Sequence, residues 1–293
     1  MTTTCPELIA ADLLHPDWRA SPRVRAFVTT RNGGVSEPPF GRWKSEHGDA
    51  NGEGVDLPGG MNLGRGSGDD LDQVEANRAR LLAHAGVSAA WLKQIHGPRV
   101  VDAADALAAA RAGTPLEADA SVTDQPGIAC TVMVADCMPV LLCDPDGRAV
   151  GAAHAGWRGL AAGVIEATAR RVAALAGCET RALHAYLGPS IGPQAFEVGA
   201  DVRDAFMNHA EAVDAAQRAA TLAATAAAFA PRAAVPGKFF ADLPALARLR
   251  LAGLGIAHAS GGDMCTFTDR ERFYSYRREP VTGRMAALIW ITP

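Results

Sequence analysis

Residues 128–159 read IACTVMVADCMPVLLCDPDGRAVGAAHAGWRG, and this stretch says more about the architecture than any other part of the chain. It holds three apolar runs, at 128–135, 139–143 and 149–154, each of a length that suits a buried strand. Only short polar or glycine-containing turns separate the runs. Strands that follow one another without an intervening helix favour a mixed α+β architecture over regular βαβ winding.

Apolar runs on both sides of this stretch predict further strands, at 24–30, 91–95, 118–123, 182–187 and 285–291. Helices are predicted at 70–85, capped by Asp70 and stopped by Gly86, at 160–176, and at 243–254 after the cap Asp242. The strands come in succession and the helices in blocks, which again favours the α+β class.

Two segments have unusual compositions. The alanine-rich segment 201–230 is predicted to be helical with a break inside it. The polar, glycine-rich segment 41–60 is predicted to be an exposed, mobile insertion. No internal repeat or linker stands out, so we expect a single domain over 1–293.

The composition excludes several classes of protein. Of 293 residues, 28 are Lys or Arg and 32 are Asp or Glu. The net charge of −4 shows no excess of basic residues of the kind that indicates nucleic-acid binding. Hydrophobic residues make up 48%, which is too many for a disordered chain. We find no apolar run that could span a membrane, no signal-peptide pattern and no CxxC pair among the six cysteines. We therefore expect a cytoplasmic protein with reduced thiols, and nothing demands more than a monomer.

Three good ligands for a transition metal stand at the ends of predicted strands. They are His96 in WLKQIHG, Cys137 in VMVADCMPVLL and His154 in VGAAHAGWRG. Two imidazoles and a thiolate suit zinc and leave a position for water or substrate. Because the three lie far apart in the sequence, their spacing is no local motif, and each could instead be a core residue whose polar atoms are satisfied.

Other polar residues accompany these three. Asp136 could orient a ligating histidine or transfer a proton, and it could also be a turn residue bonded to backbone amides. Three glycine-containing turns carry Arg31, Arg158 and Ser190. Each turn alone is ordinary, but together they predict a cleft for a phosphate or a sugar. The run MCTFTDRERFYSYRREP at 264–280 mixes aromatic and guanidinium groups, which suit a base or a phosphate but equally a subunit contact or a solvated loop.

Taken together, these segments resemble one family, the bacterial polyphenol oxidase or laccase-domain proteins of the YfiH type, now regarded as purine nucleoside phosphorylases. The resemblance covers nearly all of the chain after the first two dozen residues. The matching motifs, in order, are TTRNGGVSEPPF, NLG, GDD with NR, LKQIHG, ADASVT, ADCMPVLL, AAHAGWRG, LGPSIGP with FEVG, FYSYRR and TGRMAALIW.

This resemblance implies a single-domain mixed α/β sandwich with a zinc site on His96, Cys137 and His154. It also implies phosphorolysis of adenosine and inosine, cleavage of methylthioadenosine and deamination of adenosine. The chain departs from the family pattern at Gly66, where relatives often carry a histidine, at 194–195, where they often carry cysteines, and in the length of 41–60. None of these departures touches the three implied ligands.

The older oxidase name can be checked against the histidines. A trinuclear copper cluster needs several His-x-His pairs, and no two of the eight histidines are separated by a single residue. Copper could still occupy a His/Cys site in vitro, because it binds such donors more tightly than zinc does. The HxE and PCxxC pattern of the familiar zinc nucleoside deaminases is also missing.

We therefore expect a zinc-dependent purine nucleoside phosphorylase whose partners are small purine nucleosides and phosphate. In this hypothesis Arg31 and the glycine turns hold phosphate, with Arg158 and Ser190 as further binding residues, and Asp136 assists proton transfer. One alternative is a cysteine hydrolase in which Cys137 is the nucleophile and His96 or His154 its base. A second alternative is a protein that binds a nucleotide or an envelope precursor without catalysis.

Overall fold

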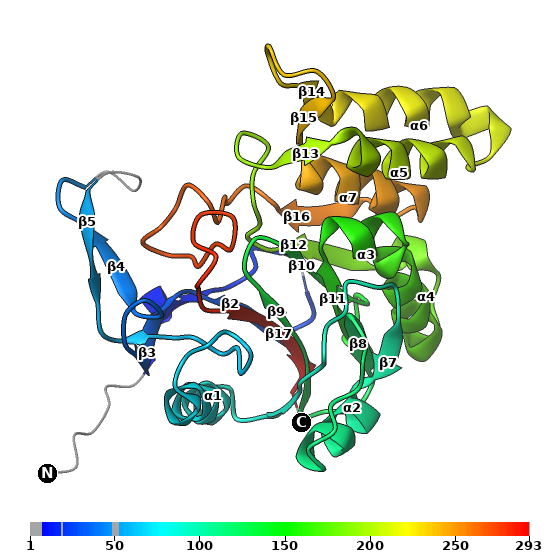
Figure 1. The fold of residues 1–293 in the computed structure, drawn as a ribbon. Coiled ribbons are helices and arrows are strands. Elements are labelled where there is room, and N and C mark those ends of the chain that lie inside the picture. The colour runs from blue at the N-terminus through cyan, green and yellow to red at the C-terminus, as the bar shows by residue number, and fades with distance from the viewer. Residues whose placement is uncertain (1–7, 19, 49–52, 293) are drawn as a thin grey trace, which may run out of the picture.

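The computed structural model describes residues 8–18, 20–48 and 53–292, and two β-sheets form its centre (Figure 1). The first sheet has five strands, in the order β1 (Leu13–Leu14), β2 (Val24–Thr29), β17 (Met285–Ile291), β9 (Ile128–Val134) and β6 (Ser88–Ala90). The second has six, in the order β16 (His258–Gly261), β12 (His184–Leu187), β10 (Met138–Cys143), β11 (Val150–Ala155), β8 (Ala120–Thr123) and β7 (Val100–Asp102). Both sheets are mixed, because β6 joins β9 in parallel while β9 joins β17 antiparallel, and the second sheet has parallel pairs at both edges.

The two sheets pack face to face through alternating residues of their strands. In β17, Ala287 and Ile289 belong to the core between the sheets, while Leu288 points to the opposite face. In β10, Leu141 lies in the same inter-sheet core and is fully buried. This alternation is the period of two that an extended chain imposes. The mixed α/β sandwich expected from the sequence is therefore confirmed.

Helices cover the outer faces of both sheets. Helix α1 (Leu71–Ala85) packs on the five-stranded sheet through Leu81. Helices α4 (Val164–Ala176) and α7 (Leu243–Gly253) pack on the outer face of the six-stranded sheet. The remaining helices are α2 (Ala103–Arg111), α3 (Trp157–Ala161), α5 (Ala200–Glu211) and α6 (Ala215–Ala227), with short 3₁₀ turns at Ala10–Asp12 and Thr180–Ala182. The result is a helix–sheet–sheet–helix sandwich (Figure 1).

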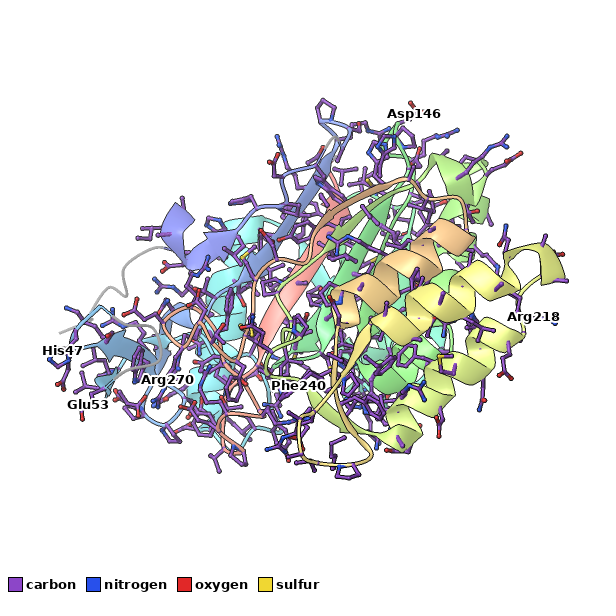
Figure 2. All side chains as sticks on the ribbon, turned by 90° about the horizontal axis from the view of Figure 1, so that it is seen from above. His47, Glu53, Asp146, Arg218, Phe240 and Arg270 are labelled. Carbon is purple, nitrogen blue, oxygen red and sulfur yellow. The ribbon has the colours of Figure 1, made fainter. Side chains whose placement is uncertain are left out.

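Smaller strands lie at the two ends of the sandwich. A three-stranded sheet of β13 (Glu197–Gly199), β15 (Lys238–Ala241) and β14 (Phe229–Pro231) joins α5 and α6. At the other end, β3 (Asn32–Ser36) precedes a hairpin of β4 (Arg42–Ser45) and β5 (Gly54–Leu57). Figure 2 shows His47 and Glu53 of this hairpin at one end of the molecule and Arg218 of α6 at the other.

Most predicted elements agree with the structure to within two residues. Asp70 caps α1 by accepting from the Asp72 amide, Gly86 ends it in the left-handed conformation, and Asp242 caps α7 through the Ala245 amide. The predicted break inside 201–230 falls between α5 and α6, where Asp214 caps the second helix. Local capping chemistry was therefore sufficient to place these helix ends.

Two predicted elements are wrong. The strand expected at 91–95 lies at 88–90 instead, and 91–95 has only an isolated bridge, at Lys93. At the end of the segment, the amides of Ile95, His96 and Gly97 donate to the carboxylate of Asp119 instead of to a neighbouring strand. The helix expected over 160–176 is two helices, α3 and α4. Gly163 separates them with a φ of 91°, which a continuous α-helix does not allow.

The segment 41–60 contains regular structure that the sequence did not predict. Trp43 of β4 is buried, and the guanidinium of Arg270 lies 4.9 Å from the centre of its ring. Residues 49–52 lie outside the described residues, and the mobility of the segment stays a prediction. In the part of the chain that the structure describes, no helix combines the length and the apolar character needed to cross a bilayer.

Candidate metal centre

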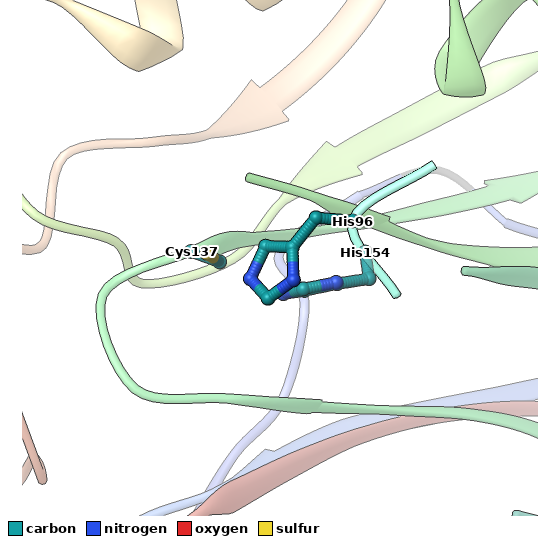
Figure 3. A group of neighbouring side chains, drawn as sticks. All are labelled: His96, Cys137 and His154. Carbon is teal, nitrogen blue, oxygen red and sulfur yellow. The ribbon is translucent and has the colours of Figure 1, made fainter. Parts of the chain in front are cut away.

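His96, Cys137 and His154 come together at one end of the sandwich (Figure 3). A ligand atom from each lies within 4.8 Å of those from the other two. Cys137 sits in the link that carries the chain from β9 in one sheet to β10 in the other, and His154 lies in β11 opposite Pro139 of β10. The cluster therefore forms where the chain crosses between the two sheets.

The backbone around the cluster is unusual. His96 has a φ of 62° and Asp136 a φ of 88°, and Ala234 is the one further non-glycine residue with a positive φ among those the structure describes. Each such residue costs about 1 kcal/mol or more of conformational energy. An ideal Cβ at Gly156 would lie 2.6 Å from the Cys137 sulfur, so only glycine fits there. Strain and close approach at one place are typical of a functional site.

A buried carboxylate holds the two histidines in position. Asp119 accepts hydrogen bonds from the backbone amides of Ile95, His96 and Gly97 at 2.7–3.1 Å. Its Oδ1 also lies 2.8 Å from Nδ1 of His154. An ionised carboxylate only accepts, so Nδ1 of His154 carries a proton, and Nε2 is the ring nitrogen that a metal would bind after the loss of its own proton.

The thiol and the imidazoles change each other's acidity. Burial would raise the pKa of Cys137, but the charge of His154 and hydrogen bonds from both histidines outweigh it and lower the pKa to about 6. Burial would likewise lower the pKa of His154, but the Cys137 thiolate and Asp119 raise it to about 9. In the protein without metal, the cluster therefore holds a thiolate beside an imidazolium near neutral pH.

The donor set fits a transition metal rather than Mg²⁺ or Ca²⁺. Two imidazole nitrogens and one thiolate sulfur are borderline and soft ligands, which suit zinc or copper, whereas the hard cations prefer oxygen. Three protein donors are also the number that catalytic zinc sites use. The residues present could thus hold zinc, and the hydrogen bond from His154 to Asp119 matches the orienting contact that such sites contain.

Asp136, next to Cys137, ties three loops together. Its Oδ1 accepts from the Thr266 hydroxyl and its Oδ2 from the Arg277 amide, both at 2.6 Å. Its carbonyl oxygen accepts from the Ile191 amide at 2.9 Å. Both carboxylate oxygens are therefore engaged with the protein.

Ser190 lies in the second glycine turn and is brought close to the same loops. Its amide donates to the Met264 carbonyl and its carbonyl accepts from the Thr266 amide. Its hydroxyl is buried, with no hydrogen-bond partner among the described residues. Ser190 thus shares its neighbour Thr266 with Asp136.

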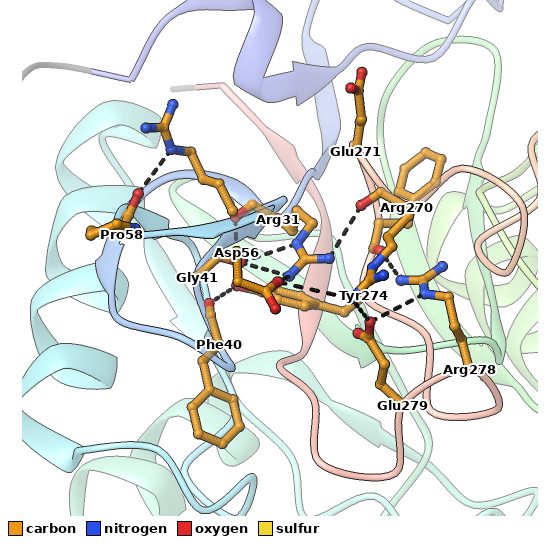
Figure 4. Close-up of polar contacts among 12 residues, drawn as sticks. Arg31, Phe40, Gly41, Asp56, Pro58, Arg270, Glu271, Tyr274, Arg278 and Glu279 are labelled. Carbon is orange, nitrogen blue, oxygen red and sulfur yellow. Dashed lines mark hydrogen bonds and ion pairs between the residues drawn. The ribbon is translucent and has the colours of Figure 1, made fainter. Parts of the chain in front are cut away.

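Arg31 and Arg158 show no hydrogen bond or ion pair with the cluster in the described residues. Arg31 is fully buried, and its guanidinium donates to the Gly41 carbonyl from Nε and Nη2 and to the Arg270 carbonyl from Nη1 (Figure 4). The Tyr274 ring lies 4.8 Å from its Cζ. Arg158 is exposed, and its Cζ lies 4.5 Å from the ring centre of Trp157.

Sequence reasoning did not identify Asp119. It could have been found, because a carboxylate inside the apolar run ADASVT must have a partner. The glycine turn around Arg158, which contains Gly156, was singled out, but the closeness of Gly156 to the Cys137 sulfur depends on the fold.

Comparisons with known proteins place the chain in a family. Residues 25–292 match the family model described as multi-copper polyphenol oxidoreductase laccase. The chain is 47% identical over 279 residues to a purine nucleoside phosphorylase of Pseudomonas aeruginosa, covering 95% of this chain and 98% of the relative. It is 43% identical over 281 residues to the purine nucleoside phosphorylase YfiH of Escherichia coli, with coverage of 95% and 98%.

Solved structures agree with the sequence relatives. A Neisseria meningitidis protein has a TM-score of 0.78 at 42% identity and covers 96% of this chain and 100% of its own. The protein YlmD from Geobacillus stearothermophilus has a TM-score of 0.79 at 25% identity, with 99% of each chain covered. With a family match over nearly its whole length and these relatives, the chain belongs to the multi-copper polyphenol oxidoreductase laccase family.

Proposed function

We propose that this protein is a zinc-dependent purine nucleoside phosphorylase that acts on adenosine and inosine. The observation that carries the proposal is the convergence of two imidazoles and one thiol on a strained backbone. Relatives that cover almost the whole chain bear the name purine nucleoside phosphorylase, which supports the reaction class.

The reaction exchanges one bond at the ribose. An oxygen of phosphate forms a bond to the anomeric carbon while the bond from that carbon to the purine nitrogen breaks. The electron pair of the broken bond goes to the purine, which takes up a proton, and ribose 1-phosphate is released. The protein must therefore hold phosphate beside the anomeric carbon and stabilise the charge that develops on the base.

In this proposal His96, Cys137 and His154 hold zinc. Zinc bound there supplies a Lewis acid that can polarise a group of the substrate. Asp119 fixes the ring of His154 and the backbone that carries His96. Gly156 leaves room for the Cys137 sulfur.

The other sequence-predicted residues take supporting roles. Asp136 uses both carboxylate oxygens to hold the loops of Thr266 and Arg277 beside Cys137, so we propose that it positions these loops. Transfer of a proton by Asp136, and substrate contacts from Arg31, Arg158 and Ser190, stay predictions. Deamination of adenosine and cleavage of methylthioadenosine are further proposed activities of the same site.

The central experiment combines metal analysis with a product assay. Protein purified without added metal should contain about one zinc per chain, and it should convert inosine to hypoxanthine and ribose 1-phosphate only when phosphate is present. Cys137→Ala should lose both zinc and turnover because one of three ligands is gone. Cys178→Ala, which removes a half-buried thiol outside the cluster, should keep both.

Retained turnover in Cys137→Ala would contradict the zinc mechanism. Conversion of adenosine to inosine and ammonia without phosphate would show deamination. Binding of nucleoside without any product would favour a binding protein.

The second candidate is a cysteine hydrolase, and the contacts of Cys137 with His96 and His154, which lower its pKa to about 6, favour it. A thiolate beside an imidazolium is the arrangement of an activated nucleophile. Iodoacetamide separates the two candidates. The hydrolase hypothesis requires an activity in zinc-free protein that alkylation of Cys137 abolishes, whereas the phosphorylase hypothesis requires activity that zinc removal abolishes.

A further inference from the structure

Arg284 lies opposite the start of the link that carries Cys137, although it is distant from all three candidate ligands in the sequence. It is the residue before β17, whose first residue, Met285, pairs with Val134 at the end of β9. The next residues after Val134 form the link that carries Cys137. The antiparallel register therefore puts Arg284 against this link.

The main chain and stem of Arg284 are held firmly. Its amide donates to Oδ1 of Asn62 at 2.8 Å, and an ideal Cβ at Gly64 would lie 2.7 Å from the Arg284 Cγ. Glycine at position 64 thus makes room for the arginine stem. The guanidinium Cζ lies 5.8 Å from the ring centre of Tyr276, which is 56% exposed. The exposed ring beside it places the guanidinium near the surface of the molecule.

The guanidinium keeps donors for a ligand. Its Nη1 donates to the carbonyls of Thr282 and Gly283 at 2.9 and 3.0 Å. No hydrogen bond from Nε or Nη2 is present among the described residues, and neither atom is buried without a partner. A guanidinium has five N–H donors in one plane. Its Nε and Nη2 edge, here called the free edge, therefore remains able to donate to two oxygens of an anion.

Charge also favours an anion ligand at this position. Burial lowers the pKa of Arg284, while the nearby Cys137 and Asp136 act in the opposite direction. The Asp136 carboxylate is already hydrogen-bonded to Thr266 and Arg277, so it does not form an ion pair that would use the Arg284 guanidinium. Arg31 differs, because all three of its guanidinium nitrogens donate to protein carbonyls.

We propose that Arg284 binds the phosphate co-substrate through the free edge of its guanidinium, an assignment that rests on the phosphorylase function proposed above. Arg284 thereby holds an attacking oxygen near the metal centre, and the Tyr276 ring and the Thr282 and Gly283 carbonyls fix the plane of the fork. A neutral nucleoside needs no such cation. Substitution of Arg284 should therefore weaken the binding of phosphate and leave the binding of inosine unchanged.

The test compares Arg284→Gln and Arg284→Lys with the wild type, all loaded with zinc. Binding of inorganic phosphate is measured by isothermal titration calorimetry, and the KM values for phosphate and inosine are measured separately. Loss of a charge-assisted pair should weaken phosphate binding about tenfold to a hundredfold in Arg284→Gln. The lysine variant should fall in between, because it keeps the charge but not the fork. Zinc content and the KM for inosine should change little.

Arg181→Gln is the matched control, since Arg181 is an exposed arginine that pairs with Glu179 far from the centre in the sequence. It should bind phosphate like the wild type. Unchanged phosphate affinity in Arg284→Gln, equal weakening for phosphate and inosine, or no phosphate binding by the wild type would overturn the assignment. Phosphate binding that depends on Arg284 in a protein without phosphorolysis would instead overturn the proposed function and leave the assignment standing.

Discussion

The carboxylate of Asp119 joins parts of the centre that come from separate segments of the chain. It orients His154 by one hydrogen bond and fixes the turn of His96 by three more. The burial of Asp119 is tolerable because each of these contacts favours its charged form, which keeps its pKa low despite desolvation. The Asp119 side chain thus positions two of the three candidate metal ligands, His96 and His154.

We predict that Asp119→Asn lowers zinc affinity about tenfold to a hundredfold, because the amide cannot accept from all of these donors. Competition with a fluorescent zinc chelator measures the affinity, and thermal unfolding shows that the variant is folded. Asp124→Asn, at an exposed aspartate after β8, serves as the control and should bind zinc normally. Equal zinc affinity for Asp119→Asn and the wild type would contradict this orienting role.

At the scale of elements, the helical segment that follows the AAHAGWRG motif is divided. Helix α3 follows Gly156 directly, and α4 begins only after Gly163. The break lets the first turn stay near the metal centre while α4 packs on the six-stranded sheet.

Gly163→Ala should destabilise the protein by about 1–2 kcal/mol, because a side chain is disfavoured at a φ of 91°. The nearest atom to the new Cβ would be 3.7 Å away, so the cost is conformational and not a clash. Urea unfolding of the variant measures it. Gly253→Ala, at the end of α7 in open space, is the control and should be neutral or stabilising. A neutral result at Gly163 would show that the break is not required.

At the scale of the whole molecule, the centre depends on how the two sheets are stacked. The link that carries Cys137 joins β9 of one sheet to β10 of the other, while His154 belongs to β11. Cys137 lies two residues before Pro139, the partner of His154, and the chain reaches it from β9 of the other sheet, so its place depends on the pairing of β10 with β11 and on the stacking of the sheets. Leu141 of β10 is a fully buried residue of the core between the sheets.

Leu141→Ala should destabilise the protein by about 2–5 kcal/mol, through lost burial and the cavity left behind. Because the cavity lies between the sheets, zinc affinity should fall as well. Leu175→Ala, at an exposed leucine of α4, should cost about 1 kcal/mol or less and leave zinc binding unchanged. Chemical denaturation and zinc competition on the same samples measure both effects. A destabilised Leu141→Ala variant with normal zinc affinity would show that zinc binding does not depend on this core.

Local chemistry was enough to predict much of the fold. Short apolar runs identified β9, β10, β11 and β17, and the caps of α1 and α7 were visible as Asp70 and Asp242. These features depend on neighbours within a few residues, which the sequence places together by itself. Residue types alone also singled out His96, Cys137 and His154, although metal binding by them stays a prediction.

Other features require the folded chain. The strand predicted at 91–95 does not form. Its last amide, that of Ile95, and the amides of His96 and Gly97 donate to Asp119, more than twenty residues later, instead of to a neighbouring strand. The need for glycine at position 156 comes from the Cys137 sulfur beside it, and the buried contacts of Arg31 come from Gly41 and Arg270. The sequence determined which strands, caps and donor side chains exist, because these follow from short-range periodicity and residue chemistry. Which donors meet was settled by the packing of two sheets, since contacts between distant segments depend on the burial of the entire core.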